Sequence, residues 1–174
     1  MKTIVIVDDE VNVLKSLQRI LRGYAWEIIS FSNPVEALEF LETRKVDLVL
    51  SDFQMPDLDG ATFLSYVMQR QPSAMRLILS GHADLNRVLE AINRAEVYRF
   101  ITKPWNDNEL RLTIEQALDV GALIEENKQL AQLVREQGDQ IRRQLNELQK
   151  IEELSPGITK VDWDDDGYID LSDN

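Results

Sequence analysis

Four short apolar runs in this chain each end in a polar or charged side chain, and this recurrence constrains the fold more than any other feature. The runs end at Asp8-Asp9, at Asp52, at Ser80 and at Lys103. Strands that are buried on both faces of a parallel sheet read as continuous runs of Val, Ile and Leu. In open α/β sheets, ligands bind outside the carboxyl ends of the strands. We therefore expect three acids, one hydroxyl and one amine to converge on a single pocket.

Segments of helical periodicity alternate with the apolar runs from residue 1 to about residue 118. Strands are expected near residues 3–7, 27–31, 48–52, 77–79 and 97–102. Asn33-Pro34 offers a helix cap followed by proline at the first helical position. Five strands alternating with five helices, one of them near residues 85–93, predict a parallel, doubly wound sheet with right-handed crossovers.

Length and composition limit the function classes. The 174 residues, 44% of them hydrophobic, suffice for one domain and an extension. The net charge of -12 argues against a nucleic-acid-binding surface, which needs clustered Lys and Arg. The absence of cysteine excludes disulfides and thiolate metal sites. Neither a membrane span nor a signal peptide is recognisable, so we expect a cytoplasmic protein without membrane contact.

Residues 119–154 form a second region, in which helix formers dominate and a heptad repeat fits. The a positions are Val120, Asn127, Val134, Ile141 and Leu148, and the d positions are Leu123, Leu130, Gln137, Gln144 and Ile151. A single Asn at an a position fixes the register of a parallel dimer, so we expect a homodimeric coiled coil. Gly138 and the glutamines weaken its middle, and the alternative is a helix that breaks or folds back at Gly138.

The tail, residues 155–174, has two interpretations. An Asp-Gly turn between alternating side chains favours a β-hairpin or a disordered tail. Six residues also match the spacing of an EF-hand calcium loop, although the helix that would leave the loop is missing: Asp162, Asp164, Asp166, Gly167, Ile169 and Asp173.

The acids at the strand ends predict a metal site. Asp8, Asp9 and Asp52 would repel one another unless a cation neutralises them. Oxygen ligands without His or Cys select a hard ion, for which Mg²⁺ is the best fit. Such an ion and Lys103 would form a cradle for a phosphoryl group, and an Asp carboxylate is itself a nucleophile in phosphoryl transfer.

The ordered motifs VIVDDE, LVLSDFQMPDLDG, LILSGH and FITKPW resemble the receiver domain of two-component response regulators over residues 1 to about 118. The resemblance implies a flavodoxin-like, five-stranded parallel sheet of order 2-1-3-4-5, which here continues into an extended C-terminal helix. We accordingly expect a receiver domain at 1–118, a coiled coil at 119–154 and a short tail at 155–174.

The resemblance also implies roles for the residues at the strand ends. Asp52 would be the phosphoacceptor that attacks the phosphohistidine of a sensor histidine kinase or phosphotransfer protein. Asp9 and Asp52 would bind Mg²⁺ directly with the backbone carbonyl of Gln54, and Asp8 would act through water. Lys103 would pair with the phosphoryl oxygens.

Three further positions have implied roles in switching and dephosphorylation. Ser80 would donate a hydrogen bond to the phosphoryl group, and Phe100 would turn inward when it does, although Phe100 also fits a simple core residue. Gln54 and His82 would tune dephosphorylation, and the alternative for His82 is an exposed loop residue. Lys103-Pro104 matches a cis peptide of the family.

The expected function is that of a response regulator whose output is binding of an unidentified downstream protein, or dimerisation, through the C-terminal helix. No enzymatic activity is expected beyond intrinsic autophosphorylation and autodephosphorylation. The alternative is the regulatory front of a longer effector, because residues 98–105 resemble receivers that precede HD-GYP cyclic-di-GMP phosphodiesterase domains. A DNA-binding regulator ranks third, since no basic helix-turn-helix follows.

Overall fold

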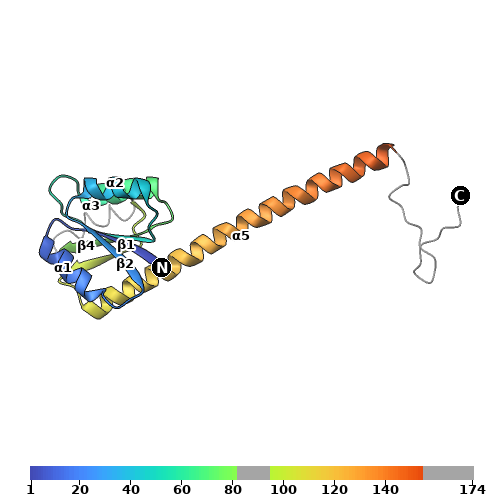
Figure 1. Ribbon diagram of the computed structural model, residues 1–174. Helices are drawn as coiled ribbons and strands as arrows, with labels where there is room; N and C mark the ends of the chain where they lie inside the picture. Colours follow the sequence, from blue (N-terminus) through green and yellow to red (C-terminus); the bar gives the residue numbers. More distant parts are fainter. Residues whose placement is uncertain (82–94, 155–174) are drawn as a thin grey trace. The chain divides into compact units, whose positions relative to one another are not determined.

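The computed structural model describes residues 1–81 and 95–154, in which five strands form one parallel sheet (Figure 1). The strands are β1 (Lys2–Val7), β2 (Trp26–Phe31), β3 (Leu48–Asp52), β4 (Met75–Gly81) and β5 (Arg99–Lys103). Their order in the sheet is β2-β1-β3-β4-β5, and every neighbouring pair is parallel. This order confirms the expected doubly wound fold.

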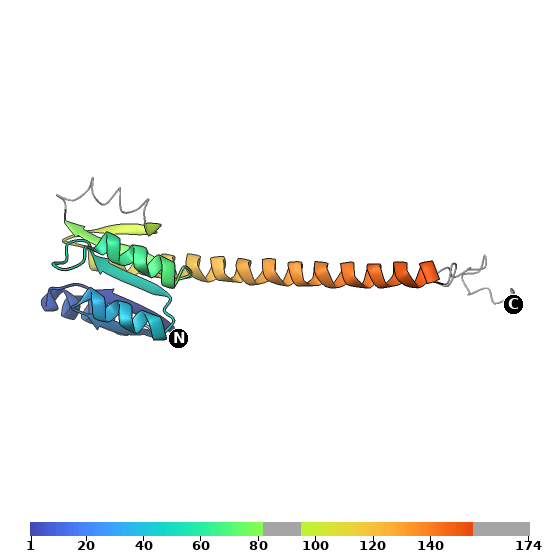
Figure 2. The same ribbon diagram turned by 90° about the horizontal axis from the view of Figure 1, so that it is seen from above.

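The described helices lie on both faces of the sheet. They are α1 (Val11–Ile20), α2 (Pro34–Thr43), α3 (Gly60–Arg70) and α5 (Asp107–Leu154). Figures 1 and 2 show α2 and α3 together on one face, with α1 on the other. The helix expected near residues 85–93 lies outside the described residues.

Two apolar cores fill the space between helices and sheet. Successive side chains of β1 point to opposite faces, so that Ile4 and Ile6 join one core and Val5 and Val7 join the other. All four are fully buried. The first core also contains residues of α1 and the first turns of α5, and the second contains residues of α2 and α3. The runs in β1, β3 and β4 are thus strands buried on both faces, as predicted, whereas the run in β5 is only partly buried.

Local signals begin the helices where the sequence places them. The side chain of Asn33 accepts a hydrogen bond from the backbone N–H of Val35, and Pro34 is the first helical residue of α2. The side chain of Asn106 accepts bonds from the N–H groups of Asn108 and Glu109, which leaves Asn106 as the cap of α5. This cap lies only three residues after Lys103.

β5 begins at Arg99, two residues later than predicted, because the chain turns just before it. Glu96 has a φ of 47°, in the left-handed region, and the extended ladder starts only after this turn. The buried guanidinium of Arg76 on β4 holds the turn, donating to the carbonyls of Ala95 at 2.8 Å and Glu96 at 3.3 Å. The same group donates to the carbonyl of Ala74 at 2.7 Å.

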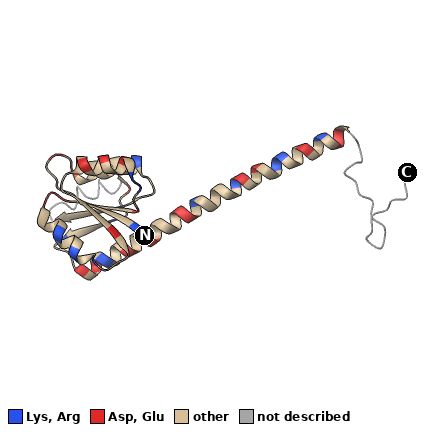
Figure 3. Ribbon diagram, in the orientation of Figure 1, with Lys and Arg blue, Asp and Glu red and all other residues tan. Residues whose placement is uncertain are grey.

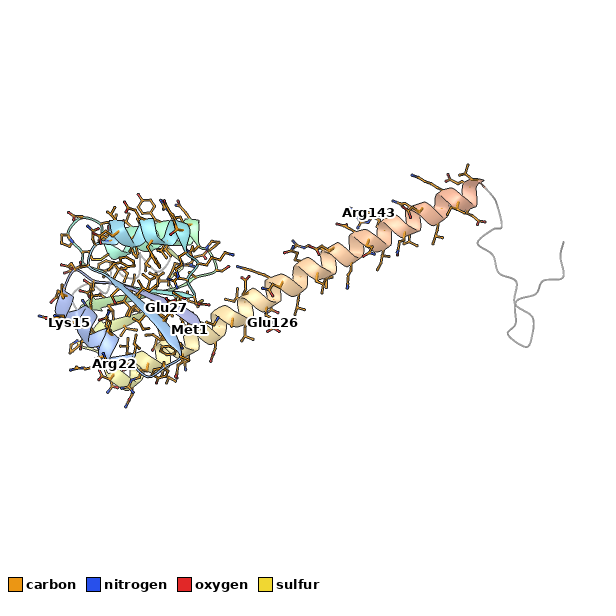
Figure 4. The ribbon with its side chains drawn as sticks, in the orientation of Figure 1. Met1, Lys15, Arg22, Glu27, Glu126 and Arg143 are labelled. Carbon is orange, nitrogen blue, oxygen red and sulfur yellow. The ribbon has the colours of Figure 1, made fainter. Side chains whose placement is uncertain are left out.

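The chain divides into two compact units, Met1–Glu126 and Asn127–Asn174. α5 runs through Gly138 as a regular helix, which rules out the alternative of a break there. Acidic and basic side chains are interspersed along it, and the side chains of its later turns, including Arg143, point outward on all sides (Figures 3 and 4). Among the described residues, no helix combines the length and apolar character that crossing a membrane requires. The tail interpretations concern residues outside the described ranges.

Candidate functional site

Three carboxylates meet at the carboxyl ends of two adjacent inner strands, β1 and β3. Asp8 and Asp9 follow β1, Asp52 is the last residue of β3, and one oxygen from each lies within 4.8 Å of the others. Asp8 is fully buried, Asp52 is 6% exposed and Asp9 is exposed. Carboxylate oxygens without nitrogen or sulfur ligands suit a hard divalent cation, so the donor set fits the ion that the sequence predicts.

Lys103, the last residue of β5, bridges two of these acids. Its Nζ atom lies 2.7 Å from Oδ1 of Asp52 and 2.9 Å from Oδ2 of Asp8. The two carboxylates come from the centre of the sheet and the amine from its edge, so three strand ends join in one polar cluster. The lysine offsets part of the negative charge that the acids bring together.

Burial and the lysine act against each other on the ionisation of Asp52. Burial raises the pKa of Asp52 above its ordinary value of 3.8, and the hydrogen bond and charge of Lys103 only partly oppose it. Burial alone would lower the pKa of Lys103, but its bonds to Asp52 and Asp8 outweigh that effect and raise the pKa above 10.5. At neutral pH Lys103 is therefore firmly cationic.

The loop that follows Asp52 is held tightly against the strand end. The N–H of Phe53 donates to the carbonyl of Leu79 at 2.8 Å, and the N–H of Gly60 donates to the carbonyl of Phe53 at 2.9 Å. A Cβ atom at Gly60 would overlap the backbone carbonyl of Asp52. Only glycine permits this approach, so Gly60 fixes the path of the loop.

A cavity of about 400 Å³ opens over the cluster. Its lining residues are Asp9, Glu10, Asp52, Phe53, Gln54, Gly81 and Lys103. A larger cavity of about 750 Å³ lies away from these residues, and charged side chains that pair with one another line it, such as Lys2 with Asp47 and Arg70 with Glu42. The smaller cavity has the convergent acids and the bridging cation, and it is the candidate site.

Sequence reasoning missed Glu10, Gly60 and Arg76. Glu10 directly follows the two acids, and its N–H donates to Asp8 at 2.8 Å, which shapes the rim of the cavity. Gly60 closes the turn-rich loop, where glycine is a common signal of close backbone approach. Arg76 interrupts an apolar run. Because a buried charge needs a polar partner, its place in a buried strand could have indicated a specific role.

The remaining predicted residues lie on the strands beside the cluster. Ser80 near the end of β4 is 3% exposed, and its hydroxyl donates to the carbonyl of Gly81 at 3.1 Å. Phe100 on β5 is partly buried and packs against the core on the α2 and α3 face. His82 lies outside the described residues. The structure thus brings Asp8, Asp9, Asp52, Gln54 and Lys103 together and sets Ser80 and Phe100 on adjacent strands.

The curated relatives of this chain include transcriptional regulatory proteins. The hydrogenase transcriptional regulatory protein HoxA of Bradyrhizobium diazoefficiens is 29% identical over 167 residues, which is 96% of this chain and 33% of that protein. The DNA-binding transcriptional regulator NtrC of Escherichia coli is 31% identical over 113 residues, 65% of this chain and 24% of that protein. The chain therefore spans a quarter to a third of the length of these curated relatives.

Solved structures similar to this chain include receiver domains. The signal receiver domain of an HD domain-containing protein from Pseudomonas fluorescens Pf-5 is 37% identical, with a TM-score of 0.67 over 70% of this chain and 97% of that one. The response regulator receiver domain family matches residues 4–115, which include every described residue of the acidic cluster. On this match, together with the sheet order and the cluster, the chain belongs to the response regulator receiver domain family.

Proposed function

We propose that this chain is the phosphoacceptor of a histidine-to-aspartate phosphorelay. A carboxylate oxygen of Asp52 attacks the phosphorus of a phosphohistidine on a sensor kinase or phosphotransfer protein. The bond between phosphorus and the histidine nitrogen breaks, that nitrogen leaves with the electron pair, and an acyl phosphate forms on Asp52. The observation that carries this proposal is the contact of Asp52 with Lys103 inside a cluster of three carboxylates.

The cluster residues have separate tasks in this proposal. Asp9 and Asp52, with the backbone carbonyl of Gln54, would hold Mg²⁺ directly, and Asp8 would hold it through water. At this position the ion would offset the negative charge that gathers when a phosphoryl group meets three acids. Lys103 pairs with the phosphoryl oxygens, which takes its Nζ atom from a carboxylate that it contacts in the resting protein.

The residues on the neighbouring strands report the phosphoryl group. The Ser80 hydroxyl, which donates to the carbonyl of Gly81 in the resting protein, donates to a phosphoryl oxygen instead. Phe100 follows it inward as the aromatic switch. Gln54 and His82 tune the hydrolysis of the acyl phosphate. We assign no reaction on a separate substrate.

Phosphorylation with acetyl phosphate and Mg²⁺, followed by intact-protein mass spectrometry, tests the acceptor. The wild type should gain one phosphoryl group, and Asp52→Asn should gain none. Asp57→Asn is the matched control, because Asp57 is an exposed acid in the loop that follows Asp52. Labelling that persists in Asp52→Asn would refute the role of Asp52.

We further propose that the output passes through α5, which forms a parallel homodimer. Support comes from the exposure of its large apolar residues in the single chain, such as Leu130 at 54% and Ile141 at 56%. Contiguous exposed apolar surface marks interaction sites. Leu130→Glu should give a monomer by light scattering, whereas Lys128→Glu on the outer face should remain dimeric. A dimeric Leu130→Glu variant would contradict the proposal.

The curated relatives, which are transcriptional regulatory proteins, do not favour the alternative of a cyclic-di-GMP phosphodiesterase front end. That reading predicts a catalytic domain beyond the tail in the natural reading frame. The length of that frame distinguishes the two directly.

A further inference from the structure

We infer that α5 can pack against a second copy of this chain along either of two overlapping rows of residues, or seams. Each seam follows its own heptad frame, and the two frames separate beyond Val134. The inference rests on the proposed dimer and adds a second arrangement to it. Up to Val134 the a and d layers follow one heptad frame, with Leu123 at 59% exposure, Leu130 at 54% and Val134 at 67%, and the exposed apolar residues Ile124 and Leu133 flank these layers at e and g positions. Beyond that point the apolar residues fit two spacings.

The first frame continues the heptad. Its layers after Val134 are Gln137, Ile141, Gln144, Leu148 and Ile151. Three of these five layers are apolar, and the two glutamines face their own copies across the dimer axis. An amide that pairs with its symmetry mate has a hydrogen-bond partner, which limits the penalty of burying it.

The second frame contains one additional four-residue step after Val134. Its layers are Gly138, Ile141, Leu145, Leu148 and Glu152. A step of this kind is a stutter, which locally unwinds a coiled coil. Leu145 is 55% exposed in the single chain and lies outside the first seam, so only the second frame buries it centrally.

Neither frame is clearly better than the other. Each buries three apolar layers beyond Val134, and Ile141 and Leu148 belong to both. The first frame carries two buried amides, whereas the second carries a layer without a side chain and a layer of like charges. The two frames differ by one residue in every second layer and share the layers between, and one residue turns a helix by about 100°. Averaged over the layers, the seam therefore rotates by roughly half that angle. A modest rotation of each helix thus exchanges two arrangements of similar merit.

A second copy is the occupant that this surface fits. Asn127 and both glutamines find amide partners when they face themselves, and residues 127–154 carry five basic and five acidic side chains. Two such helices therefore approach without net repulsion, although the whole chain has a net charge of -12. Asn127, at an a position, specifies the register of the first part of the coiled coil. The part beyond Val134 can then adopt either frame.

The phosphorylation site has a short covalent path to this helix. Lys103 contacts Asp52, and only Pro104, Trp105 and the cap residue Asn106 separate it from the first residue of α5. Trp105 and Leu110 both belong to the core on the α1 face, so the start of the helix is packed. A displacement of Lys103 therefore reaches α5 as a rotation or shift of its first turn.

Disulfide cross-linking of single-cysteine variants tests the two frames, because the chain has no cysteine of its own. Leu130→Cys reports the shared seam, Gln144→Cys the first frame and Leu145→Cys the second. Arg143→Cys, on the outer face, is the control. We expect cross-linking at all three seam positions and little at Arg143. Phosphorylation should change the ratio of Gln144→Cys to Leu145→Cys cross-linking by at least about fivefold.

Two substitutions move the equilibrium without phosphorylation. Gln137→Leu should favour cross-linking at Gln144→Cys, and Gly138→Leu should favour it at Leu145→Cys. Failure to cross-link at Leu130→Cys would overturn the dimer itself and the inference with it. Cross-linking at Leu130→Cys with a fixed Gln144 to Leu145 ratio in every variant and in the phosphorylated protein would overturn the two frames alone.

Discussion

The amine of Lys103 lies 2.7 Å from a carboxylate oxygen of Asp52, so the proposed acceptor is already paired with a cation in the resting chain. The same amine contacts Asp8 at 2.9 Å. Phosphorylation must therefore rearrange an existing ion-pair network rather than fill an empty one. The strength of this network in the resting protein can be measured.

Lys103→Met should destabilise the metal-free protein. The substitution leaves Asp52 and the fully buried Asp8 without their cation. Because removing one partner of a buried ion pair leaves a charge unpaired, the free energy of unfolding should fall by about 2–3 kcal/mol in this partly exposed pocket. Urea unfolding measures the loss, and millimolar Mg²⁺ should recover part of it by replacing the missing charge. Equal stability of variant and wild type without metal would show that the network contributes nothing.

Asp52→Asn should stabilise the protein at pH 7. Burial raises the pKa of Asp52 in the folded state above its unfolded value of 3.8, so ionised Asp52 destabilises the fold. The penalty develops as the pH rises from 3.8 through the raised pKa, and it is complete above that pKa. The stability difference should therefore shrink as the pH falls and vanish below 3.8. Urea unfolding across this pH range measures the stability difference, and Asp57→Asn, at an exposed acid, is the control. An Asp52→Asn variant less stable than the wild type at pH 7 would contradict a destabilising role for ionised Asp52.

Gly60→Ala should damage both folding and phosphorylation. The added Cβ overlaps the carbonyl of Asp52, so the loop must shift at a cost of about 2 kcal/mol or more. The shift also moves the acceptor, so the rate of labelling by acetyl phosphate should fall. Gly138→Ala is the matched control, because its Cβ meets no atom within 4 Å, and it should instead stabilise the helix by up to about 1 kcal/mol.

Arg76→Met should lower the free energy of unfolding by about 3 kcal/mol, because it strips several buried carbonyls of their donor. Thermal and urea unfolding measure the loss. The control is Arg99→Met, since Arg99 makes an exposed hydrogen bond to Gln116 and should change stability little. Similar losses of unfolding free energy in Arg76→Met and Arg99→Met would show that the buried hydrogen bonds of Arg76 do not stabilise the fold more than an exposed one.

Asn127→Val should strengthen association and loosen its specificity. An Asn at an a position specifies a two-stranded coiled coil at the expense of stability, so replacing it removes both effects. Sedimentation equilibrium should show tighter association with species larger than a dimer. Tighter association into dimers alone would mean that the oligomeric state is set elsewhere in the helix.

The sequence predicted the strands well because β1 and β3 are buried on both faces, and continuous apolar runs such as Ile4 to Val7 have no other common explanation. It also predicted the start of α2 from Asn33-Pro34, since caps are local signals. Periodicity does not say which strands are neighbours. The sheet order followed only from the resemblance to a family.

Features that depend on contacts between distant segments could not be predicted. The late start of β5 depends on Glu96 and on the guanidinium of Arg76, which is 20 positions earlier in the chain. The double ion pair of Lys103 likewise joins residues 95 positions apart in the case of Asp8. The strand ends indicated that such groups would meet, but not which pairs would touch.

The positions of β1, β3 and β5 in the sheet divide the site into a fixed and a movable half. Asp8 and Asp52 are anchored by central strands packed on both sides, whereas Lys103 ends β5, an edge strand that is largely only half-buried. An edge strand has one neighbour to shift against and fewer side chains to repack. We therefore expect the acids to keep their positions when a phosphoryl group binds and Lys103, at the edge of the sheet, to be displaced.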